Sequence, residues 1–123
     1  PITISTPQDV AAFFPDWATW TREVFWCIWL NTKNRVIGSE KISEGSLNAS
    51  IVHPRELYRG AVKMGAACIV VVHNHPSGDS TPSGADIQLT KRLARAGEVL
   101  GIDLVDHVVL GDTPSSLREL GLL

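Results

Sequence analysis

Two histidines separated by one residue, His73 and His75, follow an apolar run from Ala67 to Val72. Six small or β-branched residues without polar alternation predict a central strand that is buried on both faces. Side chains two residues apart on a strand point to the same face, so both imidazoles are expected on one side. Neutral imidazoles are common metal ligands, and this spacing makes the two histidines a chelating pair.

The next segment is predicted to turn and then begin a helix. Pro76 and Pro82 break the strand, and Ser83 resembles a helix N-cap with Asp86 three residues later, as in a capping box. Asp86 therefore falls in the first helical turn, which a strand-loop-helix unit could bring back towards the two histidines. Two imidazoles, one carboxylate and an open fourth position are the ligand set of a catalytic zinc, which lowers the pKa of its bound water to about 7.

These spacings resemble a known signature. His73-x-His75, seven residues, then Ser83-x-x-Asp86 is similar to the metal-binding motif of the JAMM (JAB or MPN+) metalloprotease superfamily. The fuller string resembles its bacterial RadC branch, through residues 73–79, 81–83, Asp86 and Asp106-His107. The resemblance implies one zinc ion held by His73, His75 and Asp86, a water activated by an upstream glutamate, and Ser83 helping to stabilise the tetrahedral intermediate.

The general base has four upstream candidates, Glu23, Glu40, Glu44 and Glu56. A zinc hydrolase needs a carboxylate within hydrogen-bond reach of the attacking water. Family members place this glutamate just before an apolar core strand, and the run that starts at Glu23 matches that position. Glu40 would lie in a hairpin strand and Glu56 in a first helical turn, where exposure or capping explains them. Glu23 is therefore the favoured base, with Ser83 as the second catalytic residue.

Each of these residues also has a purely structural interpretation. The histidines could line a solvated loop rim, and Ser83 and Asp86 would stabilise a helix N-terminus with or without a metal. Asn74 and the loop residues after it could shape the turn or orient the ligands through hydrogen bonds. His107, beside Asp106 on a later strand, is expected to be a satisfied core or edge histidine.

The surrounding elements predict an α/β (α+β type) fold with a mixed, mostly antiparallel sheet flanked by helices. The resemblance implies the MPN/JAB, cytidine-deaminase-like architecture. Residues 1–123 are interpreted as one domain, with a helical lead-in over 1–22 and a core over 23–123. The expected elements, in chain order, begin with a helix from Pro7 to Pro15 and a hairpin in which 23–30 pairs with 35–38 and 40–43. An uncertain strand at 49–52, a helix at 54–65, a strand at 67–72, a helix from Ser83 to Gly101, a strand at 102–110 and a short amphipathic tail follow. The conformation of residues 16–22 stays open.

Composition limits the classes of function. The chain has 123 residues, 44% of them apolar, and a formal net charge of −2, which gives no overall electrostatic reason to bind nucleic acid or an anionic membrane. Its two cysteines, Cys27 and Cys68, lie inside apolar runs, where a thiol behaves as a small buried hydrophobe. With no leader-like or membrane-spanning stretch, a cytoplasmic protein is expected.

Three functions remain open at this point. The first is a zinc-dependent peptidase that acts on a protein or peptide and cleaves peptide or isopeptide bonds. The second is a DNA-repair-associated protein or metal-dependent phosphodiester hydrolase, although the charge does not support nucleic acid as a partner. The third is a non-enzymatic MPN-like scaffold, against which the complete set of signature residues argues. The oligomeric state does not follow from the sequence.

Overall fold

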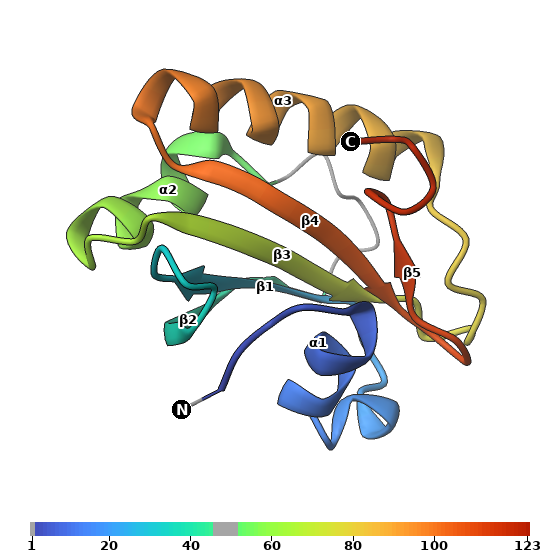
Figure 1. The fold of residues 1–123 in the computed structure, drawn as a ribbon. Helices are drawn as coiled ribbons and strands as arrows, with labels where there is room; N and C mark the ends of the chain where they lie inside the picture. The colour runs from blue at the N-terminus through green and yellow to red at the C-terminus, as the bar shows by residue number, and fades with distance from the viewer. Residues whose placement is uncertain (1, 46–51) are drawn as a thin grey trace.

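The computed structural model describes residues 2–45 and 52–123, in which helices and strands follow the order that the sequence predicts (Figure 1). The elements are α1 (Pro7–Phe13), the 3-10 helix η1 (Trp17–Thr19), β1 (Val24–Leu30), β2 (Val36–Glu44), α2 (Pro54–Lys63), β3 (Cys68–Asn74), α3 (Gly84–Leu100), β4 (Asp103–Leu110) and β5 (Ser115–Ser116). The predicted α+β class is confirmed.

The strands form one sheet in the order β2-β1-β3-β4-β5. β1 pairs antiparallel with β2 and β3, β3 pairs parallel with β4, and β4 pairs antiparallel with β5. The sheet is therefore mixed and mostly antiparallel, as predicted. All seven residues of β3 are buried, as its uninterrupted apolar run indicates. The end of β3 thus lies in the middle of the sheet.

Helices cover both faces of the sheet: α2 and α3 lie on one side and α1 on the other (Figure 1). Residues of β3 alternate between the two layers. Ile69 and Val71 belong to the same core cluster as Leu93 of α3, whereas Val70 belongs to the cluster on the α1 side. Continuing this alternation places His73 on the face that α3 covers.

Two helices begin with the same reciprocal hydrogen bonds. In α1 the Thr6 hydroxyl accepts from the Asp9 N–H, and the Asp9 carboxylate accepts from the Thr6 N–H. Ser83 and Asp86 make the same capping box at the start of α3. α3 ends at Gly101, whose φ of 74° is the left-handed conformation that glycine adopts at little cost. The predicted bounds of α3 are therefore confirmed.

Other boundaries differ from the prediction in detail. Ser39 was omitted from the return strand of the hairpin, yet it lies within β2 and pairs with Ile28. α2 ends two residues early, at Lys63, because Gly65 already has a left-handed φ of 67°. Residues 17–19 form one 3-10 turn, and β5 adds an unpredicted edge strand. The uncertain strand at 49–52 lies outside the described residues except for Val52, which is buried.

Across residues 2–45 and 52–123, helices of the length and apolarity needed to cross a membrane are absent.

Candidate metal centre

His73 and His75 lie where β3 leaves the sheet. His73 pairs with Phe25 of β1 and Val109 of β4, and the His75 N–H donates to the Leu110 carbonyl at 3.0 Å. Neighbouring strands therefore hold the backbone of both histidines, whose Nε2 atoms lie 3.1 Å apart. The His73 side chain is fully buried and that of His75 is 18% exposed, so the pair is open to solvent on the His75 side.

The capping box of α3 presents Asp86 to the histidines. The Ser83 N–H donates to Asp86 Oδ2 at 2.8 Å, and the Asp86 N–H donates to Ser83 Oγ at 3.0 Å. With its carboxylate fixed in this way, Asp86 Oδ1 lies 3.2 Å from His73 Nε2 and Oδ2 lies 3.3 Å from His75 Nε2. The same hydrogen bonds that begin the helix thus position the carboxylate.

Glu23 joins the group from the residue before β1. Its Oε1 lies 3.4 Å from His73 Nε2. Asn74 holds the backbone on both sides of it, accepting from the Val24 N–H at 2.8 Å and donating to the Arg22 carbonyl at 3.0 Å. Backbone pairing between β1 and β3 ends at Phe25 and His73. The side chain of Asn74 joins the two chain segments one residue beyond that pair. Asn74, which the sequence predicts to shape the loop or orient the ligands, thus holds the backbone on either side of Glu23.

The other three glutamates lie outside this group. Glu40 is exposed on β2, while Glu44 and Glu56 form ion pairs with neighbouring cations of their own strand or helix. In contrast, one N or O atom from each of Glu23, His73, His75 and Asp86 lies within 4.8 Å of all the others. Of the glutamates that the sequence offers, the structure brings Glu23 to the histidines.

The Nδ1 atoms of the two imidazoles, which face away from Asp86, also make hydrogen bonds. His75 Nδ1 lies 2.8 Å from the Asp79 carbonyl oxygen. His73 Nδ1 lies 2.8 Å from His107 Nε2, and His107 Nδ1 lies 2.6 Å from Thr90 Oγ1. His107 is fully buried, and it is the hydrogen-bonded core histidine that the sequence predicts. Thr90 was not singled out, although it lies one helical turn after Asp86 on the same face of α3.

The environment shifts the pKa values of this group in opposite directions. Burial raises the pKa of Glu23 above its usual range, against the opposing charges of His73 and His75. Burial acts in the same sense on Asp86, but the hydrogen bond and charge of His73 and the bonds from Ser83 prevail and hold its pKa well below the usual range. Of the two carboxylates near these imidazoles, Glu23 thus binds a proton more readily than Asp86.

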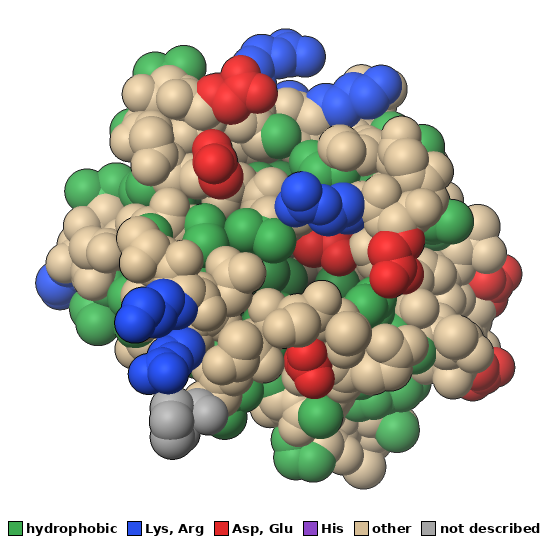
Figure 2. All heavy atoms as spheres, in the orientation of Figure 1, with side chains coloured by type: hydrophobic (Ala, Val, Ile, Leu, Met, Phe, Trp, Pro, Cys, Tyr) green, Lys and Arg blue, Asp and Glu red, His purple; other side chains and the backbone are tan. Residues whose placement is uncertain are grey.

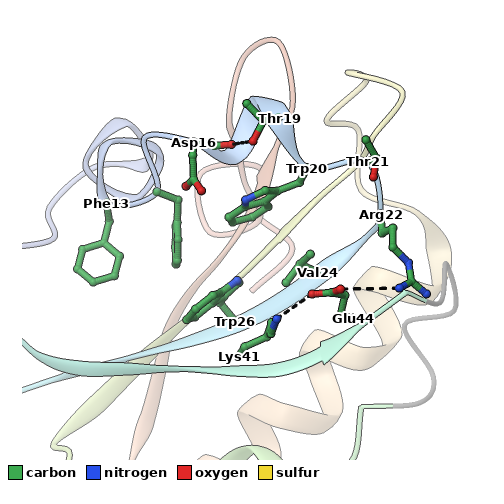
Figure 3. A pocket seen from close by; sticks show the side chains of 11 residues that line it. Phe13, Asp16, Thr19, Trp20, Thr21, Arg22, Val24, Trp26, Lys41 and Glu44 are labelled. Atoms are coloured by element: carbon green, nitrogen blue, oxygen red, sulfur yellow. Dashed lines mark hydrogen bonds and ion pairs between the residues drawn. The ribbon is translucent and has the colours of Figure 1, made fainter.

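Two hollows lie near the start of β1 and the end of β3. The larger, of about 450 Å³, is lined by the rings of Trp20 and Trp26 and by the ion-paired side chains of Lys41 and Glu44 (Figure 3). The smaller, of about 210 Å³, is lined by His75 and also by Trp20. Trp20 therefore lines both hollows, and of the two the smaller has a residue of the metal group, His75, in its lining.

The sequence model of the RadC-like JAB domain family matches residues 4–122, nearly the entire chain. The chain belongs to this family. The resemblance inferred from the histidine, serine and aspartate spacing is thereby confirmed, and the α+β fold with its mixed five-stranded sheet is consistent with a JAB/MPN-type architecture. A RadC-like JAB domain that gathers two histidines and two carboxylates fits a metal-dependent hydrolase.

Relatives of this RadC-like JAB domain include UPF0758 proteins of Desulforudis audaxviator and Desulforamulus reducens, and the UPF0758 protein BH3032 of Halalkalibacterium halodurans. They are 49%, 50% and 50% identical over 122, 124 and 122 residues, which cover 98%, 99% and 98% of this chain. The same matches cover 53%, 55% and 53% of the relatives. The chain thus spans about half the length of these curated relatives, whose names describe no activity.

Proposed function

We propose that this RadC-like JAB domain is a zinc-dependent metallopeptidase that cleaves peptide or isopeptide bonds. His73, His75 and Asp86 would hold one zinc ion, Glu23 would act as the general base, and Ser83 would stabilise the oxyanion. The observation that carries the proposal is the convergence of four electron-pair donors, two imidazoles and two carboxylates, within 4.8 Å of one another.

The spacing of the three proposed ligands supports zinc. Atoms bound at about 2.1 Å to a tetrahedral ion lie about 3.4 Å from one another. The separations are 3.1 Å between the two Nε2 atoms, 3.2 Å from His73 to Asp86 and 3.3 Å from His75 to Asp86. The triangle is therefore close to the size that zinc requires.

The electrostatics of the group support a cation at its centre. A carbonyl oxygen can only accept, so His75 Nδ1 must donate to Asp79, and a neutral His75 turns an unprotonated Nε2 towards Asp86. Lone pairs and carboxylates gathered in a buried site repel one another unless a positive charge lies among them. A proton or a metal ion would serve, and the mixed nitrogen and oxygen set with an open side is typical of catalytic zinc.

The chain's own residues supply the remaining chemistry. A bound zinc ion supplies a Lewis acid that polarises a carbonyl and makes water nucleophilic near neutral pH. Glu23 would take a proton from the attacking water and pass it to the leaving amine, a task that suits a carboxylate whose pKa is raised. The Ser83 oxygen accepts from the Asp86 N–H, which leaves its own O–H free to donate to the oxyanion.

The hollow beside His75 suits a side chain of a polypeptide substrate. His75 and Trp20 line this smaller hollow, whereas Arg22 and Val24, the neighbours of Glu23, line the larger one together with Trp26. A peptide with one side chain in the smaller hollow would bring its backbone near the metal group. Aromatic walls with a few polar groups are characteristic of such subsites.

Surface charge gives no comparable support for nucleic acid. On the face shown in Figure 2, Lys and Arg side chains are interspersed with Asp and Glu and do not form a stripe. The formal net charge is −2. Binding to a phosphate backbone is dominated by clustered cations, so a peptide substrate suits this chain better.

The test is hydrolysis of a panel of fluorogenic peptide and isopeptide substrates by the zinc-loaded chain. We expect Glu23→Gln to keep its zinc and lose turnover by at least about 10²-fold, and His75→Ala to lose both. Glu56→Gln, at an exposed position of α2 outside the metal group, should keep both. A Glu23→Gln protein of undiminished specific activity would refute the assignment of the base. Cleavage of DNA but of no peptide, abolished by His75→Ala, would replace the peptidase with a phosphodiesterase.

A further inference from the structure

Three hydrogen bonds in series run from the backbone of α3 to the metal group. Thr90 Oγ1 lies 2.7 Å from the carbonyl oxygen of Asp86 and 2.6 Å from His107 Nδ1. His107 Nε2 lies 2.8 Å from His73 Nδ1. The side chains of Thr90, His107 and His73 are all fully buried, so water does not compete for these bonds.

The direction of every bond in this series follows from its first member. A backbone carbonyl has no proton, so Thr90 must donate its single hydroxyl hydrogen to Asp86 and can only accept from His107 Nδ1–H. A neutral His107 protonated at Nδ1 has a bare Nε2, which accepts from His73 Nδ1–H. The remaining nitrogen of His73, Nε2, then carries a lone pair, and it faces Asp86 at 3.2 Å.

We propose that Thr90, acting through His107, is a positioning residue that holds His73 in its Nδ1–H tautomer and so directs a bare Nε2 at the metal. A metal ligand must offer a lone pair, and only one of the two neutral tautomers of His73 does so in this orientation. The inference rests on the proposed function for the presence of the metal. The tautomer itself is a property of the metal-free chain.

Without the Thr90 hydroxyl, nothing in this series determines which nitrogen of His107 carries the proton. His107 could then place its proton on Nε2 and donate to His73 Nδ1, which forces the His73 proton onto Nε2. In that arrangement a hydrogen occupies the position where zinc would bind, and the proton must leave before the ion enters. Both arrangements keep the hydrogen bond between the histidines, so the hydroxyl decides between them.

Thr90→Val and Thr90→Ser separate this role from packing. Valine keeps the branched shape and removes the hydroxyl, whereas serine keeps the hydroxyl and removes a methyl group. Competition with a chelator would measure zinc affinity, and thermal melts of the metal-free proteins would measure folding. We expect zinc affinity to fall about 10- to 100-fold for Thr90→Val and to stay near wild type for Thr90→Ser. A merely structural role would lower the melting temperature of either variant without this difference in affinity.

The tautomer of His73 can also be observed directly by NMR. Long-range ¹H–¹⁵N correlation spectra of the metal-free chain at pH 8 distinguish a histidine protonated at Nδ1 from one protonated at Nε2. We expect Nδ1–H for His73 in wild type and Thr90→Ser, and an Nε2–H population in Thr90→Val. A neutral His73 protonated at Nε2 in wild type, or undiminished zinc affinity in Thr90→Val, would overturn the inference. An Nδ1–H signal in a wild-type chain that binds no zinc would support the inference and refute the metal centre.

Discussion

The side-chain oxygen of Asn74 accepts a hydrogen bond from the backbone N–H of Val24 at 2.8 Å, across 50 positions in the sequence. The side-chain nitrogen of Asn74 donates to the carbonyl of Arg22. Asn74 is 1% exposed, so these bonds are shielded from bulk water. A residue next to the proposed ligand His73 therefore fixes the backbone on both sides of Glu23.

Asn74→Ala tests this link between the histidine strand and the proposed base. Loss of both bonds frees the backbone around Glu23, and a displacement near 1 Å costs about 10²-fold in rate. We expect kcat to fall by that order while zinc content and KM change little. Asn31→Ala is the control, because the Asn31 side chain also makes two hydrogen bonds to the backbone, accepting from two N–H groups in the turn between β1 and β2. It should lose stability only, and wild-type kcat in Asn74→Ala would contradict the positioning role.

Ser83 is expected to combine a structural and a catalytic contribution, and α1 supplies the comparison. Thr6 and Ser83 are N-caps with the same reciprocal bonds to an aspartate three residues later. Thr6→Ala and Ser83→Ala should each lower the free energy of unfolding by about 1 kcal/mol. Denaturant titrations would measure this loss. Only Ser83→Ala should also lower kcat, by about 10²-fold, because it removes an oxyanion donor. Equal activity of the two variants would show that Ser83 acts only as a helix N-cap and has no catalytic role.

Glu23 should make the stability of the metal-free chain depend on pH. The pKa of Glu23 is higher in the folded than in the unfolded chain, where it is 4.5. Above pH 4.5 the unfolded chain therefore loses a proton that the native state still binds. The free energy of unfolding falls as pH rises from there through the folded pKa. Glu23→Gln should therefore melt at a higher temperature than wild type at pH 7 and at a similar temperature below pH 4.

Glu44→Gln is the control of opposite sign, because the hydrogen bond and charge of Lys41 lower the pKa of Glu44. Removing this carboxylate should lower the melting temperature at pH 7, since its stabilisation is present above the unfolded pKa and is lost at acid pH. A Glu23→Gln protein that melts below wild type at pH 7 would contradict a raised pKa of Glu23, because the charged carboxylate would then stabilise the native state.

Gly97 lies on a face of α3 that is in close contact with neighbouring residues. A Cβ at this position would meet the Ile102 carbonyl oxygen and would lie 2.5 Å from the Tyr58 hydroxyl, which donates to the Leu93 carbonyl. Gly97→Ala should therefore destabilise the fold by about 1–3 kcal/mol in chemical denaturation. Gly84→Ala, in the same helix with nothing within 4 Å, should be neutral or stabilising. Equal stability of the two variants would contradict this packing.

Local patterns predicted much of what surrounds the metal group. The apolar run predicted buried β3, and the spacing of His73 and His75 predicted that their imidazoles share one side. Ser83 and Asp86 form a capping box within four residues, so the start of α3 could be predicted, and Gly101 indicated its end. Each of these features is indicated by the types and spacing of residues close in sequence, which is the information that a single sequence contains.

Contacts that depend on strand register could not be predicted. A register shift between Ile69 and Val70 in the β3–β4 pairing places His107 opposite Val71, on the side of the sheet that carries His73. Regular alternation from Leu104 would have turned His107 to the other face. The sequence contains no local signal for this bulge, and hence none for the bonds from Thr90 through His107.

Metal content tests the central claim most directly. Elemental analysis would compare wild type, Asp86→Asn and Asp9→Asn, all purified without added metal or metal-affinity chromatography and then offered zinc before desalting. Asn can still accept the N–H of its N-cap, and Asp9 occupies the same capping position in α1. We predict about one zinc per chain in wild type and Asp9→Asn, and a clear loss in Asp86→Asn. A folded wild-type chain that retains no metal would contradict the account, and the group would then be two histidines and two carboxylates that share protons.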